Sequence, residues 1–167
     1  IISFADAKKI AKDGNILIYI YHGPVDKVIL NNNTRLRNNS TAVDDFAGYD
    51  LVLLGDVHKF QYMNQEKTIA YSGSLIQQNY GESVDDHGYI KWNISNKTSQ
   101  FIRINNIHKY QTIVVNDGKL ENNDLNITIT SNSHVKFVVS NTTYNDMNNI
   151  IQTLKENHNF SDNAVVY

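Results

Sequence analysis

Residues 50–81 read DLVLLGDVHKFQYMNQEKTIAYSGSLIQQNYG. Leu51–Leu54 is a short apolar run that stops at Gly55, which is typical of a strand buried on both faces and followed by a tight turn. Asp56 and His58 come directly after this turn. Ligands collect beyond the carboxyl ends of strands in open α/β sheets, so the pair indicates a metal site. The alternative is a solvated loop.

A third candidate ligand, His22, follows an earlier apolar segment. Residues 16–21 are predicted to form a strand, and Gly23 and Pro24 end it because a proline does not continue a central ladder. If the two strands run parallel, as alternating strands and helices suggest, His22, Asp56 and His58 emerge at one edge of the sheet. This convergence is the main prediction about the site.

The remaining periodicities divide the chain into two predicted domains. We expect an α/β domain over residues 1–105 and a small α+β domain over residues 106–167. The first has a helix over 3–14, a long polar connection over 26–45 with a short strand at 27–30, a strand at 68–71, and a hairpin of 88–94 with 101–104 that closes the sheet. The second has strands at 112–115, 127–130, 135–139 and 164–167, and a helix whose core face is Tyr144, Met147, Ile150, Ile151 and Leu154.

Composition limits the function classes. The chain has 167 residues, 41% of them hydrophobic and 19% charged, with a net charge of −2, so we expect a real core and no broad polyanion-binding surface. A local basic rim is compatible with these values. The absence of cysteine excludes thiolate sites and disulfides and favours an intracellular setting. We expect no membrane partner, because no apolar run approaches the roughly 18 residues of a bilayer span.

The two ends of the sequence predict a fragment. The chain begins at Ile1 without a methionine and reaches Tyr167 inside an apolar stretch. We therefore expect it to be part of a longer protein.

The chemistry of the loops favours phosphate esters. In an extended segment, Asp56 and His58 point the same way and reach separate ions of a two-metal centre about 3.5 to 4 Å across. Oxygen and imidazole ligands without sulfur suit Mn²⁺, Fe or Zn²⁺. Lys59 adds a cation beside a bound phosphate. The backbone amides of Ser72, Gly73 and Ser74 offer an anion site, with an ordinary β-turn as the alternative, and His87 is interpreted as structural.

Four stretches together resemble a known family. Tyr49–Lys59, Ile69–Leu75, His87–Tyr89 and Trp92–Asn93 resemble the late motifs of SbcD-type nucleases. These calcineurin-like metallophosphoesterases include the meiotic-recombination-eleven nucleases of double-strand-break repair. The resemblance implies the C-terminal half of a metallophosphoesterase β-sandwich flanked by helices, followed by a DNA-capping domain.

The resemblance also assigns residues. The family's Gly-His-x-His motif falls on Gly55–His58, its Tyr-Pro-Gly-Ser motif on Tyr71–Ser74, and its isolated metal histidine on His22. Asp56 replaces the usual first histidine and Ser72 the usual proline, but an aspartate is still a competent ligand. The resemblance puts Asp56 and His22 on one ion and His58 on the other.

A second register within the superfamily is less compatible with the sequence. Leu51–His58 also resembles the superfamily's opening Asp-x-His or Gly-Asp-x-x-Asp motif. That register requires a downstream Gly-Asn-His-Asp or Gly-Asn-His-Glu signature, which the chain lacks, and Lys59 occupies the second aspartate. In the late-motif register the remaining metal ligands precede Ile1.

The implied function is a metal-dependent DNA exonuclease or endonuclease of the double-strand-break repair type. It would hydrolyse phosphodiesters with water activated by two divalent metal ions, preferably Mn²⁺, and the isolated chain is expected to be inactive. DNA, an SbcC-type ATPase and a second copy of the protein are the implied partners. Two alternatives stay open: a phosphodiesterase or nucleotidase for small substrates, and a non-catalytic binding or scaffold module with a vestigial metal site.

Overall fold

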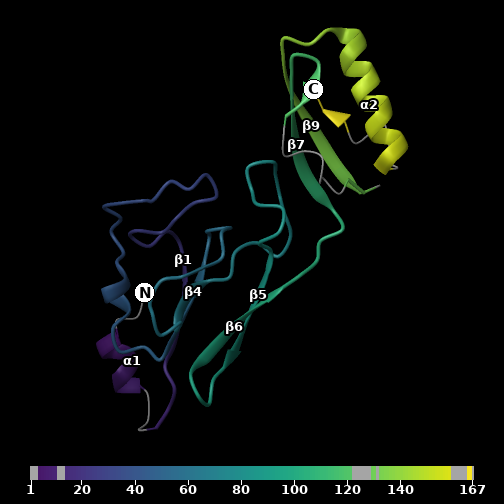
Figure 1. Cartoon of the computed structure of the whole chain (residues 1–167). Coiled ribbons are helices and arrows are strands. Elements are labelled where there is room, and N and C mark those ends of the chain that lie inside the picture. The colour runs from purple at the N-terminus through teal and green to yellow at the C-terminus, as the bar shows by residue number, and fades with distance from the viewer. Residues whose placement is uncertain (1–3, 11–13, 122–128, 131, 159–164, 167) are drawn as a thin grey trace. The chain divides into compact units, whose positions relative to one another are not determined.

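The computed structural model describes residues 4–10, 14–121, 129–130, 132–158 and 165–166 (Figure 1). The chain divides into two compact units, of which the first comprises Ile1–Ile76 with Gly81–Ile104, and the second Gln77–Tyr80 with Asn105–Tyr167. The secondary structure is mixed α/β, as predicted. The finer assignment, to half of a metallophosphoesterase β-sandwich, stays a prediction.

A four-stranded sheet forms the centre of the first unit. Its order is β1 (Ile18–His22), β2 (Leu51–Gly55), β4 (Ile69–Tyr71) and β3 (Gln61–Tyr62). β2 is parallel to both β1 and β4, whereas β3 is antiparallel to β4. The predicted parallel pairing of the first two strands is therefore confirmed. Its register sets His22 opposite Gly55, which brings the ends of β1 and β2 to the same edge.

Apolar side chains from the strands and the loop after β1 fill the core of this unit. Leu51 and Val52 of β2 are fully buried, as the apolar run predicts. Val25 and Val28 of the loop and Phe46 of the 3-10 helix η1 (Val43–Phe46) join the buried set. The long polar connection is therefore an anchored part of the core, because it contributes apolar side chains at intervals.

The polar connection and the hairpin differ in detail from the predictions. Residues 27–30 do not form a strand, and only an isolated antiparallel bridge joins Ile29 to Arg35. β5 (Gly88–Asn93) and β6 (Thr98–Arg103) form the predicted hairpin, but as a separate two-stranded sheet. The expectation that this hairpin closes the main sheet was wrong, because the backbone hydrogen bonds of β5 and β6 pair only with each other among the described strands. Side chains make the connection instead, with the rings of Phe60 and Phe101 stacked 3.9 Å apart.

The first helix, α1 (Phe4–Ile10), agrees with the predicted helix. Residue 3 and residues 11–13 of the predicted range lie outside the described residues. Gly14, the last residue of the predicted range, has a φ of +85°, a left-handed conformation that favours glycine.

The second unit is built on another four-stranded sheet. Its order is β10 (Val165–Val166), β9 (Ser133–Ser140), β7 (Lys109–Asn116) and β8 (Lys119–Leu120). β9 is parallel to β10 and β7, and β8 turns back antiparallel to β7 through Asp117 and Gly118. Among the described strands of this sheet, the pairing of β8 with β7 is the antiparallel one. The predicted strand at 127–130 lies partly outside the described residues, and Ile129 and Thr130 are not in a strand.

Helix α2 (Tyr144–His158) covers this sheet. Thr143 caps its first turn: Thr143 Oγ1 accepts from the amide of Asp146 at 3.2 Å and donates to the carboxylate of the same residue at 2.6 Å. Met147, Ile151 and Leu154 are buried in the core, as predicted. Tyr144 is 80% exposed, so its assignment to the core was wrong. It is the first helical residue, where it lines an open hollow instead of packing inward.

Two hydrogen bonds explain why Gln77 belongs to the second unit. Its Oε1 accepts from the amide of Tyr110 at 2.7 Å, and its Nε2 donates to the carbonyl of the same residue at 2.8 Å. The side chain thus takes the place of a neighbouring strand at the start of β7.

Candidate functional site

The ends of β1 and β2 bring two of the predicted ligands together. His22 is the last residue of β1 and pairs with Gly55, and Asp56 follows β2 directly. A Cβ added to Gly55 would lie 2.9 Å from Cδ2 of His22, so the imidazole ring lies over this glycine. Gly55 is therefore needed for the close approach of His22.

The turn itself occurs one residue later than predicted. Asp56 has a φ of +87°, a left-handed conformation that is uncommon outside glycine. The expectation of an extended Asp56–His58 segment was therefore wrong at its first residue. Asp56 and His58 are nevertheless both exposed, while Val57 between them is buried. The buried valine anchors the loop and leaves the two candidate ligands on its outer side.

The hydroxyl of Tyr71 holds the backbone of the loop that follows His22 through two hydrogen bonds. Its hydroxyl donates to the carbonyl of Gly23 at 2.7 Å and accepts from the amide of Val25 at 2.9 Å. Burial, with smaller contributions from the nearby Tyr21 and Asp56, raises the pKa of Tyr71 to about 12. The hydroxyl therefore keeps its proton and acts as a donor that fixes the backbone next to His22.

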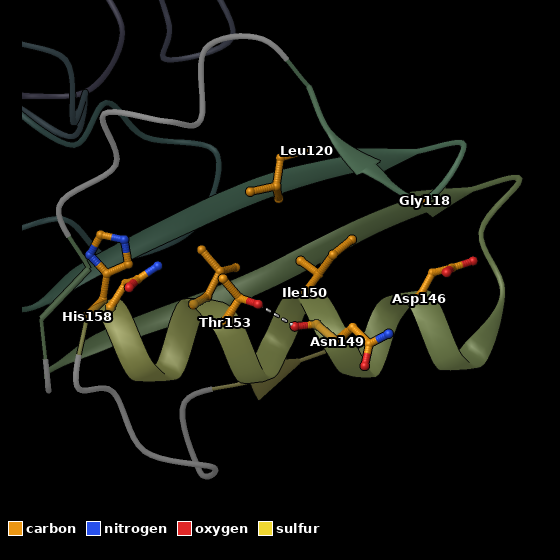
Figure 2. A pocket seen from close by; sticks show the side chains of 9 residues that line it. Gly118, Leu120, Asp146, Asn149, Ile150, Thr153 and His158 are labelled. Carbon is orange, nitrogen blue, oxygen red and sulfur yellow. Dashed lines mark hydrogen bonds between the residues drawn. The ribbon is translucent and has the colours of Figure 1, made fainter.

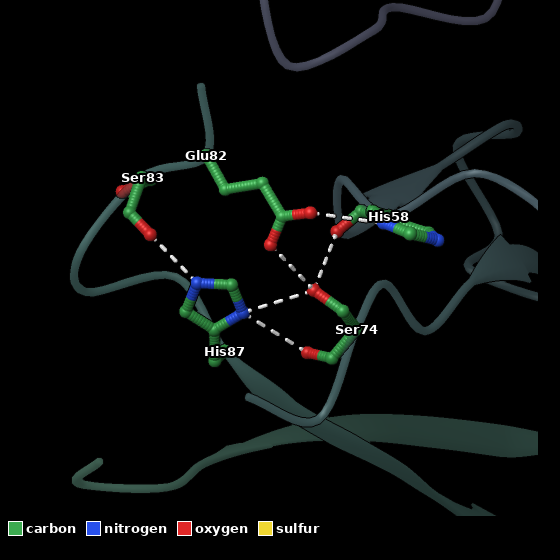
Figure 3. A network of polar contacts seen from close by, with 5 residues as sticks. All are labelled: His58, Ser74, Glu82, Ser83 and His87. Atoms are coloured by element: carbon green, nitrogen blue, oxygen red, sulfur yellow. Dashed lines mark hydrogen bonds and ion pairs between the residues drawn. The ribbon is translucent and has the colours of Figure 1, made fainter. Parts of the chain in front are cut away.

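A buried polar network lies behind His58 (Figure 3). Glu82 Oε1 lies 2.9 Å from His58 Nδ1, and Glu82 Oε2 accepts from the hydroxyl of Ser74 at 3.2 Å. That hydroxyl is also 3.1 Å from Nδ1 of His87, whose Nε2 lies 2.6 Å from the carbonyl of Ser83. Ser74, Glu82 and His87 are all buried. His87 thus has the structural role that was predicted for it.

Glu82 gives His58 a defined orientation. When Nδ1 donates to the carboxylate, Nε2 carries the free lone pair, and the side chain of His58 is 42% exposed. Carboxylate–histidine pairs of this kind orient metal-binding imidazoles. Sequence reasoning did not identify Glu82, because it lies 24 residues from His58 in a polar loop without a motif.

The turn at residues 72–74 contacts the backbone of the loop that contains His58. Gly73 has a φ of +74°, and an added Cβ would lie 2.7 Å from the amide nitrogen of Phe60 and 2.9 Å from the carbonyl oxygen of His58. The amide of Ser74 donates to the same carbonyl at 3.0 Å. In this arrangement the amide of Ser74 is engaged within the protein, so it does not serve the predicted anion site.

Two other predicted anion-binding residues have local partners. Lys59 Nζ donates to Oδ1 of Asn33 at 2.6 Å, which holds the ammonium group beside the polar connection. The hydroxyl of Ser72 donates to the carbonyl of Gly73 at 3.3 Å. The lysine remains one residue away from His58 and on the same loop.

The described residues do not complete a metal site. Within the described ranges, no group of three or more His, Cys, Asp or Glu side chains is arranged to hold a metal ion. The donor types still suit one, because His22 and His58 offer imidazole nitrogens and Asp56 a carboxylate. The donor types of the three side chains therefore suit a metal ion, but the described residues do not gather them into one cluster.

A separate hollow of about 460 Å³ lies in the second unit, beside α2 and β8 (Figure 2). Two of its polar side chains have local partners: the carboxylate of Asp146 accepts from the hydroxyl of Thr143, and Thr153 Oγ1 donates to the carbonyl of Asn149 at 2.8 Å. His158 lies at one end of the hollow. No candidate ligand from the sequence lines this hollow.

The helices of the described segments are too short or too polar to cross a membrane. No protein-family model matches the chain. An uncharacterized protein of Acanthamoeba polyphaga mimivirus is 39% identical over 150 residues, which cover 90% of this chain and 11% of that protein. The chain therefore spans about a ninth of the length of the relative that it matches.

Proposed function

We propose that this chain forms part of the catalytic domain of a metal-dependent nuclease, similar to the SbcD-type members of the calcineurin-like metallophosphoesterases. The observation that carries the proposal is the position of His22, Asp56 and His58 at or just after the carboxyl ends of the parallel strands β1 and β2. The pairing of His58 with a buried Glu82 supports it, since metal-binding histidines use such partners.

The proposed cofactor is a pair of divalent metal ions, with Mn²⁺ preferred. His22 and Asp56 would serve one ion and His58 the other, and residues outside the described ranges would supply the remaining ligands. Such ions lower the pKa of an attacking water and clamp the phosphate oxygens. The residues of this chain would hold these ligands in place. Glu82 would orient His58, and the hydroxyl of Tyr71 would fix the backbone next to His22.

The proposed substrate is DNA, and the proposed setting is intracellular DNA repair. The second unit would act as the DNA-capping part, and an SbcC-type ATPase and a second copy of the protein are proposed partners. The assignment of these partners rests on the resemblance of the motifs, not on a surface of the described residues.

Nuclease and metal-binding assays on the complete protein test this function. After metal removal and addition of Mn²⁺, we expect degradation of duplex DNA, and we expect His58→Ala to abolish it. His108→Ala is a matched control, because His108 is an exposed histidine outside the site. Unchanged activity in His58→Ala would contradict the proposal.

The same preparation separates the alternatives. Hydrolysis of a small phosphodiester without degradation of DNA would favour a small-substrate phosphodiesterase. Failure of the complete protein to take up Mn²⁺, Fe²⁺ or Zn²⁺ would favour a binding module with a vestigial site.

A further inference from the structure

A short ribbon of the first unit carries three exposed cations. We call Lys27–Arg37 the basic ribbon, because its two arms run antiparallel. The amide of Lys27 donates to the carbonyl of Leu36, and the amide of Leu36 donates to the carbonyl of Val28, both at 2.9 Å. An isolated bridge between Ile29 and Arg35 continues the pairing.

The core fixes the direction in which the cations point. Val28 is fully buried, and Leu36 packs partly buried against the same core. Since neighbouring residues of an extended arm face opposite sides, Arg35 and Arg37 face away from the core, and both are exposed. Lys27 is exposed as well. Within the described part of the chain, none of these three side chains makes an ion pair or a side-chain hydrogen bond.

Side chains tie the ribbon to the loop of the candidate ligands. Gln61 Oε1 accepts from the amide of Ile29 at 2.9 Å, and Gln61 Nε2 donates to its carbonyl at 2.8 Å. Lys59 Nζ donates to Asn33 Oδ1 at 2.6 Å. These contacts hold the ribbon beside the segment that contains His58.

The ribbon has the chemistry of a phosphate-backbone contact. Guanidinium groups such as those of Arg35 and Arg37 can donate bidentate hydrogen bonds to phosphate, and the exposed side chains of Asn32, Asn33 and Asn38 add amide donors for phosphate and sugar. The carboxylate of Asp26, the sole one in residues 24–41, accepts from the amide of Asn39 at 3.4 Å. We propose that the basic ribbon binds the phosphate backbone of a nucleic acid strand and directs it to the edge formed by His22, Asp56 and His58. The directing role rests on the proposed nuclease function, whereas the binding does not.

The test measures binding of the full chain to DNA as a function of salt. We compare the wild type with the triple variant Lys27→Gln, Arg35→Gln, Arg37→Gln, using short fluorescent single-stranded and duplex DNA between about 50 and 200 mM salt. The triple variant should bind about 10- to 100-fold more weakly, and the slope of log affinity against log salt should fall by about 2 to 3. The three side chains are exposed, so the melting temperature should not change.

A matched control removes the same charge elsewhere. Lys67→Gln, Lys91→Gln, Arg103→Gln also neutralises three exposed cations of the first unit, outside the ribbon, and it should retain the affinity and the salt slope of the wild type. An equal loss of DNA affinity in both triple variants would overturn the proposal, because DNA binding would then depend on the total charge of the chain and not on the basic ribbon. Wild-type affinity in the ribbon variant would overturn it as well. A third outcome would also overturn the proposal: the wild type binds a polyglutamate peptide but not DNA, and the ribbon variant loses the binding of this peptide. The partner of the ribbon would then be an acidic protein.

The nuclease proposal and the ribbon proposal can fail independently of each other. If His58→Ala leaves Mn²⁺ uptake and DNA degradation by the complete protein unchanged, the nuclease proposal fails. Loss of DNA binding in the ribbon variant would still support the ribbon as a nucleic acid contact.

Discussion

Oε1 of Glu82 lies 2.9 Å from Nδ1 of His58 across a sequence separation of 24 residues. The side chain of Glu82 is 2% exposed, whereas that of His58 is 42% exposed. A buried carboxylate therefore holds an accessible imidazole in one orientation.

Removal of this carboxylate should weaken metal binding. We expect Glu82→Ala to lower the Mn²⁺ affinity of the complete protein about 10- to 100-fold in calorimetric titration, because His58 loses its orienting partner. Glu82→Gln keeps an acceptor for His58 and should recover part of the affinity. Glu66→Ala, which removes an exposed glutamate, is the control. Equal affinity in Glu82→Ala and Glu66→Ala would rule out an orienting role.

Tyr71 should make the stability of the first unit sensitive to alkaline pH. Burial raises its pKa to about 12, so the unfolded chain loses this proton at a lower pH than the folded chain does. The stabilisation that Tyr71 provides is therefore complete below about pH 10 and is lost as the pH rises towards 12. We expect a loss of at most about 3 kcal/mol over this window in urea unfolding.

Tyr71→Phe isolates this effect from those of Tyr19 and Tyr80, whose pKa values burial also raises. At neutral pH the variant should lose about 1 to 3 kcal/mol, because the carbonyl of Gly23 and the amide of Val25 lose their partner. Its alkaline slope should be shallower than that of the wild type. The exposed Tyr144→Phe should behave as the wild type, and identical slopes in all three proteins would refute the assignment.

The ionised carboxylate of Asp50 should stabilise the first unit at pH values above the pKa of this group. Its carboxylate accepts from Lys97 Nζ at 2.6 Å and from the amide of Leu17 at 2.7 Å, and these two hydrogen bonds lower its pKa. A lowered pKa means that the stabilisation is present above about pH 4 and is lost as pH falls through the folded-state value.

Asp50→Asn should therefore cost about 1 to 3 kcal/mol at neutral pH, and the difference from the wild type should shrink in acid. Urea unfolding across this pH range measures both quantities. The exposed Asp44→Asn serves as the control. A pH-independent difference would show that the charge of Asp50 is not the cause.

Two glycine substitutions should have different consequences. In Gly55→Ala the new methyl group meets the ring of His22, a side chain that moves at low cost, so we expect reduced Mn²⁺ affinity of the complete protein with little loss of stability. In Gly73→Ala it meets backbone atoms of Phe60 and His58 at a φ of +74°, so we expect a loss of about 1 to 3 kcal/mol. Thermal unfolding and metal titration of both variants distinguish the two effects. Equal stability losses would contradict this distinction.

Local patterns in the sequence determined the elements of this protein. The apolar run Leu51–Leu54 predicted the buried strand β2, and the alternation of elements predicted its parallel pairing with β1. Helical spacing predicted the buried face of α2 at Met147, Ile151 and Leu154. These features depend on the backbone period, which a short window of sequence contains.

Tertiary structure alone decided how the candidate ligands are held. The contact of Glu82 with His58, the tether from Tyr71 to Gly23 and the left-handed backbone of Asp56 leave no periodic signal. Each depends on the path of a loop that brings distant residues within hydrogen-bonding distance or forces a single residue into an unusual conformation. The sequence by itself therefore determined which side chains reach the edge of the sheet, and the tertiary structure decided their orientation.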